Sequence, residues 1–184
     1  MFFDRKRCFI LNAIQKYFRY RQSLIDQYLK GDMTKREYLA KNYETVLNND
    51  IGPFKNTDTV EKALYNYQYY NAMAKQYKYE SASDYIDWEI KKDLQHQSNY
   101  YYSRKDDATR RVLKMLDYKG IEAYFVKVKS KALKGKLFEI VIHDYKNMIL
   151  HSTNEGILNS LREEGVFSEG SRISLIDGYV NQRY

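Results

Sequence analysis

A single change of pattern at Gly120 limits what this chain can fold into. Before Gly120, apolar residues recur every three or four positions, as on one side of a helix; after it, runs of Val, Ile, Phe and Tyr alternate with polar residues. The pattern predicts an α+β fold in two parts. A helical domain, residues 1–119, precedes an α+β module, residues 120–184.

The helical domain is predicted to be a bundle of four or five helices. Residues 4–30 separate into an apolar and a polar side, and Gly31 is placed to cap the end of that helix. Thr34 and Glu37 have the spacing of a capping box, which predicts a second helix over about 35–48.

Two further helical stretches follow the only proline, Pro53. One opens at 58–61, and the next is capped by Ser81 or Ser83. Whether residues 82–117 form one helix or two stays open. The spacing predicts a core drawn from the following residues: Ile10, Ile14, Tyr17, Leu24, Leu64, Tyr67, Ile86, Ile90, Val112, Leu116, Val126, Val141 and Leu175.

The module after Gly120 is predicted to be a small antiparallel sheet covered by a helix, in the order βββαββ. Asp177-Gly178 is a strong signal for a tight hairpin between the last two strands. The predicted strands are 121–129, 137–145, 148–151, 173–176 and 179–182, with a helix over 154–164. Whether this module and the helical domain form one compact unit stays open.

Positive charge is concentrated in two places. The net charge is +7, and residues 1–21 and 127–136 each carry +5, so the rest of the chain carries −3. Such foci favour an anionic partner, with nucleic acid first. The predicted contact residues are Arg5, Lys16 and Arg19 on the first helix, and Lys127, Lys129, Lys131, Lys134 and Lys136 on the first hairpin. The alternatives are a solvated helix face and lysines that block strand-edge aggregation.

Tyrosine is unusually abundant, at 20 of 184 residues. Tyr100, Tyr101 and Tyr102 are consecutive on a predicted helix, so at least one of them should be exposed beside Arg104. Exposed Tyr beside Arg is typical of base stacking or of a protein-binding hot spot. Arg21 projects into the apolar side of the first helix and is expected to pair with a carboxylate such as Asp84 or Asp87.

Catalytic and cofactor motifs are not found in the sequence. It has one cysteine, Cys8, three histidines and no glycine-rich phosphate loop. A turn at 146–147 would pair His143 with Leu150 and would leave His143 and His151 on opposite faces of the sheet, against a metal site. No cofactor and no metal are therefore expected, and the chain is predicted to be non-enzymatic. It lacks a signal peptide and any long apolar run, so we expect it in the cytoplasm and not in a membrane.

The sequence thus predicts a cytoplasmic nucleic-acid-binding protein, with RNA favoured over DNA because exposed tyrosines can stack on unpaired bases. The alternative is a protein-interaction or self-associating module built on the exposed tyrosines and on Arg7 or Arg21. The oligomeric state stays open.

Overall fold

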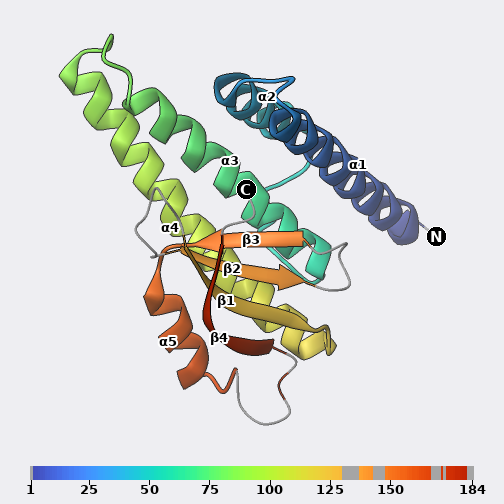
Figure 1. The fold of residues 1–184 in the computed structure, drawn as a ribbon. Helices are drawn as coiled ribbons and strands as arrows, with labels where there is room; N and C mark the ends of the chain where they lie inside the picture. The colour runs from blue at the N-terminus through green and yellow to red at the C-terminus, as the bar shows by residue number, and fades with distance from the viewer. Residues whose placement is uncertain (1, 130–136, 143–147, 167–170, 172, 182–184) are drawn as a thin grey trace. The chain divides into compact units, whose positions relative to one another are not determined.

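The computed structural model describes residues 2–129, 137–142, 148–166, 171 and 173–181. The chain divides into two compact units, Met1–Lys105 and Asp106–Tyr184. Their boundary falls inside one long helix, α4, which spans Trp88–Lys119 (Figure 1). The first unit is helical and the second contains a sheet, so the predicted α+β class is confirmed. No described helix has the length and apolarity required to cross a membrane.

The first two helices are α1, Phe2–Lys30, and α2, Lys35–Leu47. α1 ends where Gly31 takes a φ of 83°, a left-handed conformation that glycine adopts without strain. The predicted capping box begins α2: the Thr34 hydroxyl accepts a hydrogen bond from the Glu37 N–H, and the Glu37 carboxylate accepts one from the Thr34 N–H at 2.8 Å. This backbone hydrogen bond lowers the pKa of Glu37.

The third helix, α3, spans Val60–Ser81, and its N-cap is Thr59, which accepts a hydrogen bond from the Lys62 N–H. Thr59 lies in the predicted opening of this helix, so the sequence signal at its start is confirmed. The preceding break is fixed by Gly52, which has a φ of 72° and whose missing Cβ would lie 2.4 Å from the Tyr65 ring. Only glycine fits this position.

The prediction that Ser81 or Ser83 begins the fourth helix was wrong. Ser81 belongs to the last turn of α3, and Ser83 accepts a hydrogen bond from the Tyr85 N–H in the connecting turn. α4 starts at Trp88, and residues 88–119 form one helix. Ile86 therefore lies in the turn and is half-buried, and Ile90, in the first turn of α4, is 51 % exposed. Neither belongs to the core.

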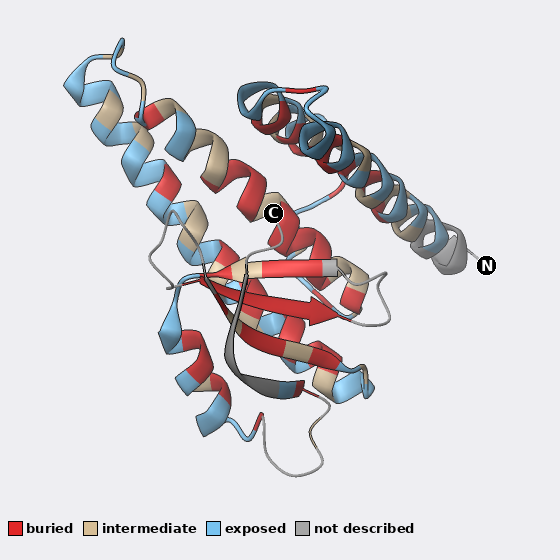
Figure 2. Cartoon of the chain, viewed as in Figure 1, coloured by how far each residue is buried: buried red, intermediate tan, exposed pale blue. Residues whose placement is uncertain are grey.

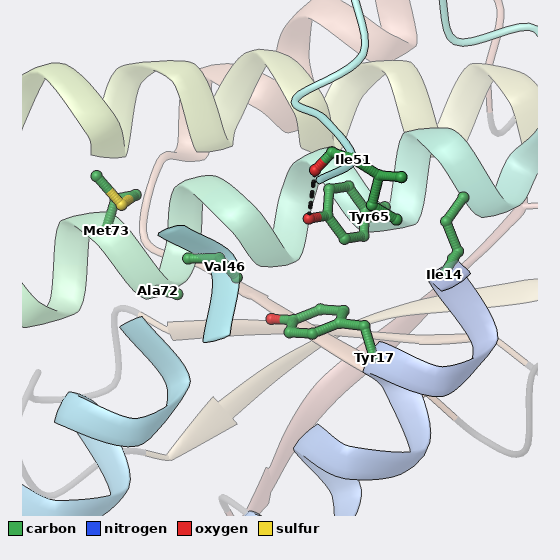
Figure 3. Close-up of a cluster of buried hydrophobic side chains, with 7 residues drawn as sticks. All are labelled: Ile14, Tyr17, Val46, Ile51, Tyr65, Ala72 and Met73. Carbon is green, nitrogen blue, oxygen red and sulfur yellow. Dashed lines mark hydrogen bonds between the residues drawn. The ribbon is translucent and has the colours of Figure 1, made fainter. Parts of the chain in front are cut away.

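The core of the helical unit is built around aromatic rings. Tyr17 and Tyr65 meet edge to face with ring centroids 5.3 Å apart, and the Tyr65 hydroxyl donates to the Ile51 carbonyl at 2.8 Å (Figure 3). The Tyr17 hydroxyl donates to the buried side-chain carbonyl of Asn42 at 3.2 Å. Burial raises the pKa of both tyrosines. Tyrosine is thus abundant partly because it can fill a core while pairing its hydroxyl.

Most of the predicted core is confirmed. The buried members are Ile14, Tyr17, Leu24, Leu64, Tyr67, Val112, Leu116, Val126 and Val141. Ile10 is half-buried and packs against the cluster that contains Ile14. The side chain of Leu175 lies outside the described residues.

The second unit contains the elements β1, Ala123–Lys129; β2, Leu137–Ile142; β3, Met148–Ser152; α5, Glu155–Glu163; and β4, Ile173–Asn181. Its four strands form a mixed sheet in the order β3-β2-β1-β4. β1 pairs with β2 and β2 with β3 in antiparallel fashion, as predicted, but β4 runs parallel to β1. A strand that joins a sheet in parallel is reached by a crossover connection. Here the connection from β3 to β4 contains the helix α5.

The prediction of a hairpin at Asp177-Gly178 was wrong. β4 is one continuous strand, and its register against β1 shifts at this point, because Val126 pairs with Ile176 while Lys127 pairs with Tyr179. Asp177 and Gly178 lie between these two pairs and form a β-bulge. A flexible Asp-Gly pair can adopt a bulge as well as a hairpin turn. The order is therefore βββαβ instead of βββαββ, and the sheet is mixed instead of antiparallel.

The second half of α4 is held by polar contacts to the sheet unit. The Asp106 carboxylate accepts hydrogen bonds from the side chains of Ser152 and Asn154 at 3.4 and 3.1 Å. Lys114 forms an ion pair with Glu164, and this contact lowers the pKa of Glu164. These contacts place residues from Asp106 onward with the sheet, so the unit boundary falls earlier than Gly120, the position at which the sequence pattern changes.

Candidate nucleic-acid interface

The outward side of α1 carries polar and basic side chains over two helical turns. Asn12, Gln15, Lys16 and Arg19 are all exposed, whereas Tyr17 on the opposite side is buried. We call these four residues the basic face of α1. The structure therefore brings together two of the three predicted helix contacts. The third, Arg5, lies in α1, but its side chain is outside the described residues.

No acid balances the basic face locally. The sequence contains no Asp or Glu between Asp4 and Asp26, and Asp26 accepts a hydrogen bond from Gln22 at 3.0 Å. Neither Lys16 nor Arg19 forms an ion pair with any described residue. Both cations therefore remain available to an anionic partner.

Two exposed aromatic side chains flank the basic face. Phe9 is 64 % exposed and Tyr20 is 43 % exposed, and they lie seven residues before and four residues after Lys16 on the same helix. Neither ring was among the contact residues predicted from the sequence. The sequence could have predicted the position of Phe9. Residues seven positions apart lie on the same side of a helix, so Phe9 is expected on the same side as Lys16.

The predicted tyrosine group is divided between internal and exposed positions. Tyr101 is half-buried and lies parallel to the Tyr77 ring of α3, with centroids 5.7 Å apart. Tyr102 is also half-buried, with the ammonium of Lys78 from α3 5.8 Å from its ring. Burial raises the pKa of both Tyr101 and Tyr102. Both rings thus serve the pairing of α3 with α4.

Tyr100 and Arg104 keep the exposed arrangement that the sequence predicts. Tyr100 is 57 % exposed and meets the Tyr101 ring edge to face at 5.1 Å. Arg104 is exposed, and its guanidinium lies 5.5 Å from the Tyr70 ring. Tyr100 and Arg104 are four residues apart on α4, so an exposed ring and a cation share one side of this helix.

Most of the predicted lysine hairpin lies outside the described residues. Lys127 is half-buried in β1, opposite Phe138 of β2. Lys129 ends β1, and its side chain is not described. Lys131, Lys134 and Lys136 lie in the 130–136 gap. Their contribution stays a prediction.

One histidine of the described sheet lies within hydrogen-bonding distance of an acid. His151 Nε2 is 3.1 Å from Glu139 Oε1, and the two residues are direct partners across β2 and β3. Glu139 is fully buried and is the only charged residue of β2. The sequence analysis missed this pair because it expected His143 opposite Leu150, whereas the structure pairs Leu150 with Ile140. His143 lies outside the described residues. Within the described ranges, no three His, Cys, Asp or Glu side chains are grouped to hold a metal ion.

The helical unit also contains a row of polar side chains on one side of α3, Gln68, Asn71 and Lys75, which the sequence analysis missed. We call this row the polar seam. Gln68 and Asn71 are buried on α3 where apolar residues are expected, and Lys75, seven residues after Gln68, is half-buried on the same side. Burial lowers the pKa of Lys75 to about 7, and the nearby charges of Arg21 and Lys105 lower it further. The signal was the helical spacing of these three polar residues.

Arg21 and Lys105 are the buried cations of this region. Arg21 is 8 % exposed and Lys105 is 4 % exposed, and the Lys105 ammonium lies 6.0 Å from the Tyr67 ring. The expectation that Arg21 pairs with Asp84 or Asp87 stays a prediction; both of these acids are exposed.

Comparison with known proteins places the chain in a family without an assigned role. The chain belongs to the family of unknown function DUF6648, whose model matches residues 7–184. No curated protein and no solved structure matches the chain. Any function must therefore be argued from the chain's own residues.

Proposed function

We propose that this protein binds nucleic acid, with RNA favoured over DNA, through the basic face of α1. The observation that supports the proposal is the exposure of Lys16 and Arg19 on a helix side free of acids. Cations on such a side can replace the counterions of a phosphate backbone, which provides most of the affinity in sequence-independent binding.

The neutral members of the face have a separate role. Asn12 and Gln15 are exposed beside the cations, and their amide groups donate hydrogen bonds to phosphate or sugar oxygens. Contacts of this kind position a nucleic acid on a protein without reading its sequence. The proposal therefore predicts binding that depends strongly on salt and weakly on sequence.

The preference for RNA comes from the exposed rings. Phe9 and Tyr20 flank the basic face, and Tyr100 is exposed near Arg104 on α4. Unpaired bases can stack on such rings, whereas the bases of a duplex are already stacked on one another. A single strand is therefore the preferred ligand, and RNA is favoured over DNA because RNA offers unpaired bases in its loops, bulges and ends. The lysine-rich hairpin, from Lys127 to Lys136, is proposed as a second phosphate contact on the basis of its sequence alone.

The test is the binding of a fluorescein-labelled single-stranded RNA of mixed sequence, followed by fluorescence anisotropy at low salt. The double variant Lys16→Glu/Arg19→Glu should bind at least about tenfold more weakly, because each lost contact to a charged group contributes about 1 kcal/mol or more. The matched control is Lys41→Glu/Lys55→Glu, which makes the same change of charge at two exposed lysines outside α1.

The comparison of the two variants shows whether RNA binding depends on the basic face of α1 or only on the net charge of the protein. The control should bind nearly as well as the wild type. Equal losses in both variants would mean that only net charge matters and that α1 is not the interface. Absence of binding by the wild type at low salt would refute the proposed function.

A further inference from the structure

The connection between α3 and α4 exposes several large apolar side chains. Tyr85 is 99 % exposed, Trp88 70 % and Ile90 51 %, and Tyr79, near the end of α3, is 40 % exposed. Figure 2 shows this end of the helix pair mostly in the colour of exposed residues. Exposed Trp and Tyr side chains gathered in one place are typical of protein-binding surfaces, where they contribute most of the affinity.

Acidic residues are interspersed with these side chains in the sequence. Residues 79–93, which we call the acidic tip, contain five Asp or Glu and two Lys, for a net charge of −3. Asp84, Asp87 and Glu89 are all exposed. The Lys92 ammonium lies 5.3 Å from the centroid of the Trp88 ring, so this ring already accommodates a cation. The acidic tip therefore fits a partner that is basic and carries apolar side chains.

α1 has the matching properties. Residues 2–30 carry a net charge of +5, and the basic face lies between the exposed rings of Phe9 and Tyr20. Each surface combines apolar side chains with charges opposite to those of the other, a combination that steers association and fixes its orientation. The apolar side of α1 is occupied within its own unit, because Ile14 and Tyr17 pack in the core. Only its exposed side is open to a partner.

We propose that the acidic tip of one copy of this chain binds the basic face of α1 in a second copy. The contact is heterologous, because two different surfaces meet, so a dimer still has one open tip and one open α1 face. Further copies can then add until a ring closes. This inference does not rest on the proposed function, because it requires no nucleic acid.

The chain contains one built-in reporter of this contact. Trp88 is its only tryptophan, so the intrinsic tryptophan emission comes from the acidic tip alone. Burial of Trp88 against a second copy should shift the emission to shorter wavelength as the protein concentration rises at low salt. Added salt should reverse the shift, because it screens the charges that bring the two surfaces together.

The decisive experiment uses two variants that each damage one surface. Tyr85→Ser/Trp88→Ser removes the exposed rings of the acidic tip and leaves α1 intact, and Lys16→Glu/Arg19→Glu reverses the α1 charges and leaves the tip intact. Sedimentation velocity at low salt should show self-association of the wild type and a monomer for each variant. An equal mixture of the two variants should form dimers and nothing larger. The intact α1 face of one variant binds the intact acidic tip of the other, and the two damaged surfaces that remain cannot bind a further copy.

The control is Tyr118→Ser, which removes an aromatic side chain that is 82 % exposed elsewhere on the chain. It should associate as the wild type does. All the altered side chains are exposed, and an unchanged circular dichroism spectrum confirms that the variants fold. A wild type that stays monomeric at low salt would overturn the inference. A mixture of the two variants that stays monomeric would also overturn it. The same holds if Lys16→Glu/Arg19→Glu still dimerises. Loss of RNA binding alone would leave the inference intact.

Discussion

Replacing Lys75 tests whether the polar seam of the helical unit costs stability. Lys75 is half-buried, and its pKa of about 7 lies below the ordinary value of 10.5 because burial and the charges of Arg21 and Lys105 disfavour the protonated form. Between these two pH values the unfolded chain binds more protons than the folded one. The contribution of Lys75 to the free energy of unfolding is therefore most unfavourable below about pH 7. It becomes less unfavourable as the pH increases toward 10.5.

The size of the effect follows from the shift. One unit of pKa corresponds to about 1.4 kcal/mol, so a fully buried group with this shift would cost about 5 kcal/mol. Water reaches a half-buried side chain and screens part of that cost, so we expect about 1–3 kcal/mol. Lys75→Met keeps an unbranched side chain of similar length and removes the charge. At neutral pH the variant should therefore be more stable than the wild type by about that amount.

The assay is urea unfolding followed by circular dichroism at several pH values between about 6 and 9. The stability gained by Lys75→Met should fall by roughly half between about pH 7 and pH 9, because the wild-type lysine loses its proton there in the folded state. Lys41→Met, at an exposed position on α2, should change stability by less than about 0.5 kcal/mol at every pH. A Lys75→Met variant that is less stable than the wild type, or equally stabilised at all pH values, would refute the reasoning.

Three further predictions follow from other parts of the structure. Gly52→Ala should destabilise the helical unit by about 2–3 kcal/mol in thermal unfolding, because Gly52 has a φ of 72° and a Cβ would lie 2.4 Å from the Tyr65 ring; an unchanged melting temperature would contradict this. The slope of log affinity for single-stranded RNA against log salt should be smaller by about 1.4 in Lys16→Glu/Arg19→Glu than in the wild type, since each lost phosphate contact removes about 0.7; parallel slopes would mean that neither residue meets a phosphate. RNA should reverse the concentration-dependent blue shift of Trp88, because RNA and the acidic tip would compete for the same side of α1; a shift that RNA leaves unchanged would separate the two surfaces.

Local signals in the sequence predicted the parts of the fold that depend on neighbouring residues. The capping box of Thr34 and Glu37 fixed the start of α2 because both of its partners lie within one helical turn. The apolar spacing of Ile14, Tyr17 and Leu24 identified the buried side of α1 for the same reason. The change at Gly120 located the start of the sheet, three residues before β1.

Two of the errors arose where a distant segment decides the structure. Asp177-Gly178 suits a hairpin or a bulge, and pairing with β1 selects the bulge. The register of β2 against β3 depends on the strand pairing, so the contact of Glu139 with His151 was not visible in the spacing of the histidines.

The candidate site was predicted in part. The exposure of Lys16 and Arg19 was predicted correctly because exposure on a helix follows from periodicity, and Tyr100 and Arg104 are exposed as expected. Their contact with nucleic acid stays a prediction. Tyr101 is half-buried because its ring stacks against Tyr77 of a different helix, which no pattern within α4 reveals. The polar seam was missed for the same reason, since burial of Gln68 and Lys75 depends on the helices that pack over α3.

Ultraviolet cross-linking of the protein to single-stranded RNA, with the modified peptides identified by mass spectrometry, tests the proposed interface most directly. Aromatic rings stacked on bases form such cross-links, so the proposal predicts adducts on the α1 peptides that contain Phe9 and Tyr20, and on the α4 peptide that contains Tyr100. Lys16→Glu/Arg19→Glu should reduce the α1 adducts at equal RNA concentration. Adducts confined to other segments, or α1 adducts that the variant leaves unchanged, would contradict the claim that α1 is the nucleic-acid interface.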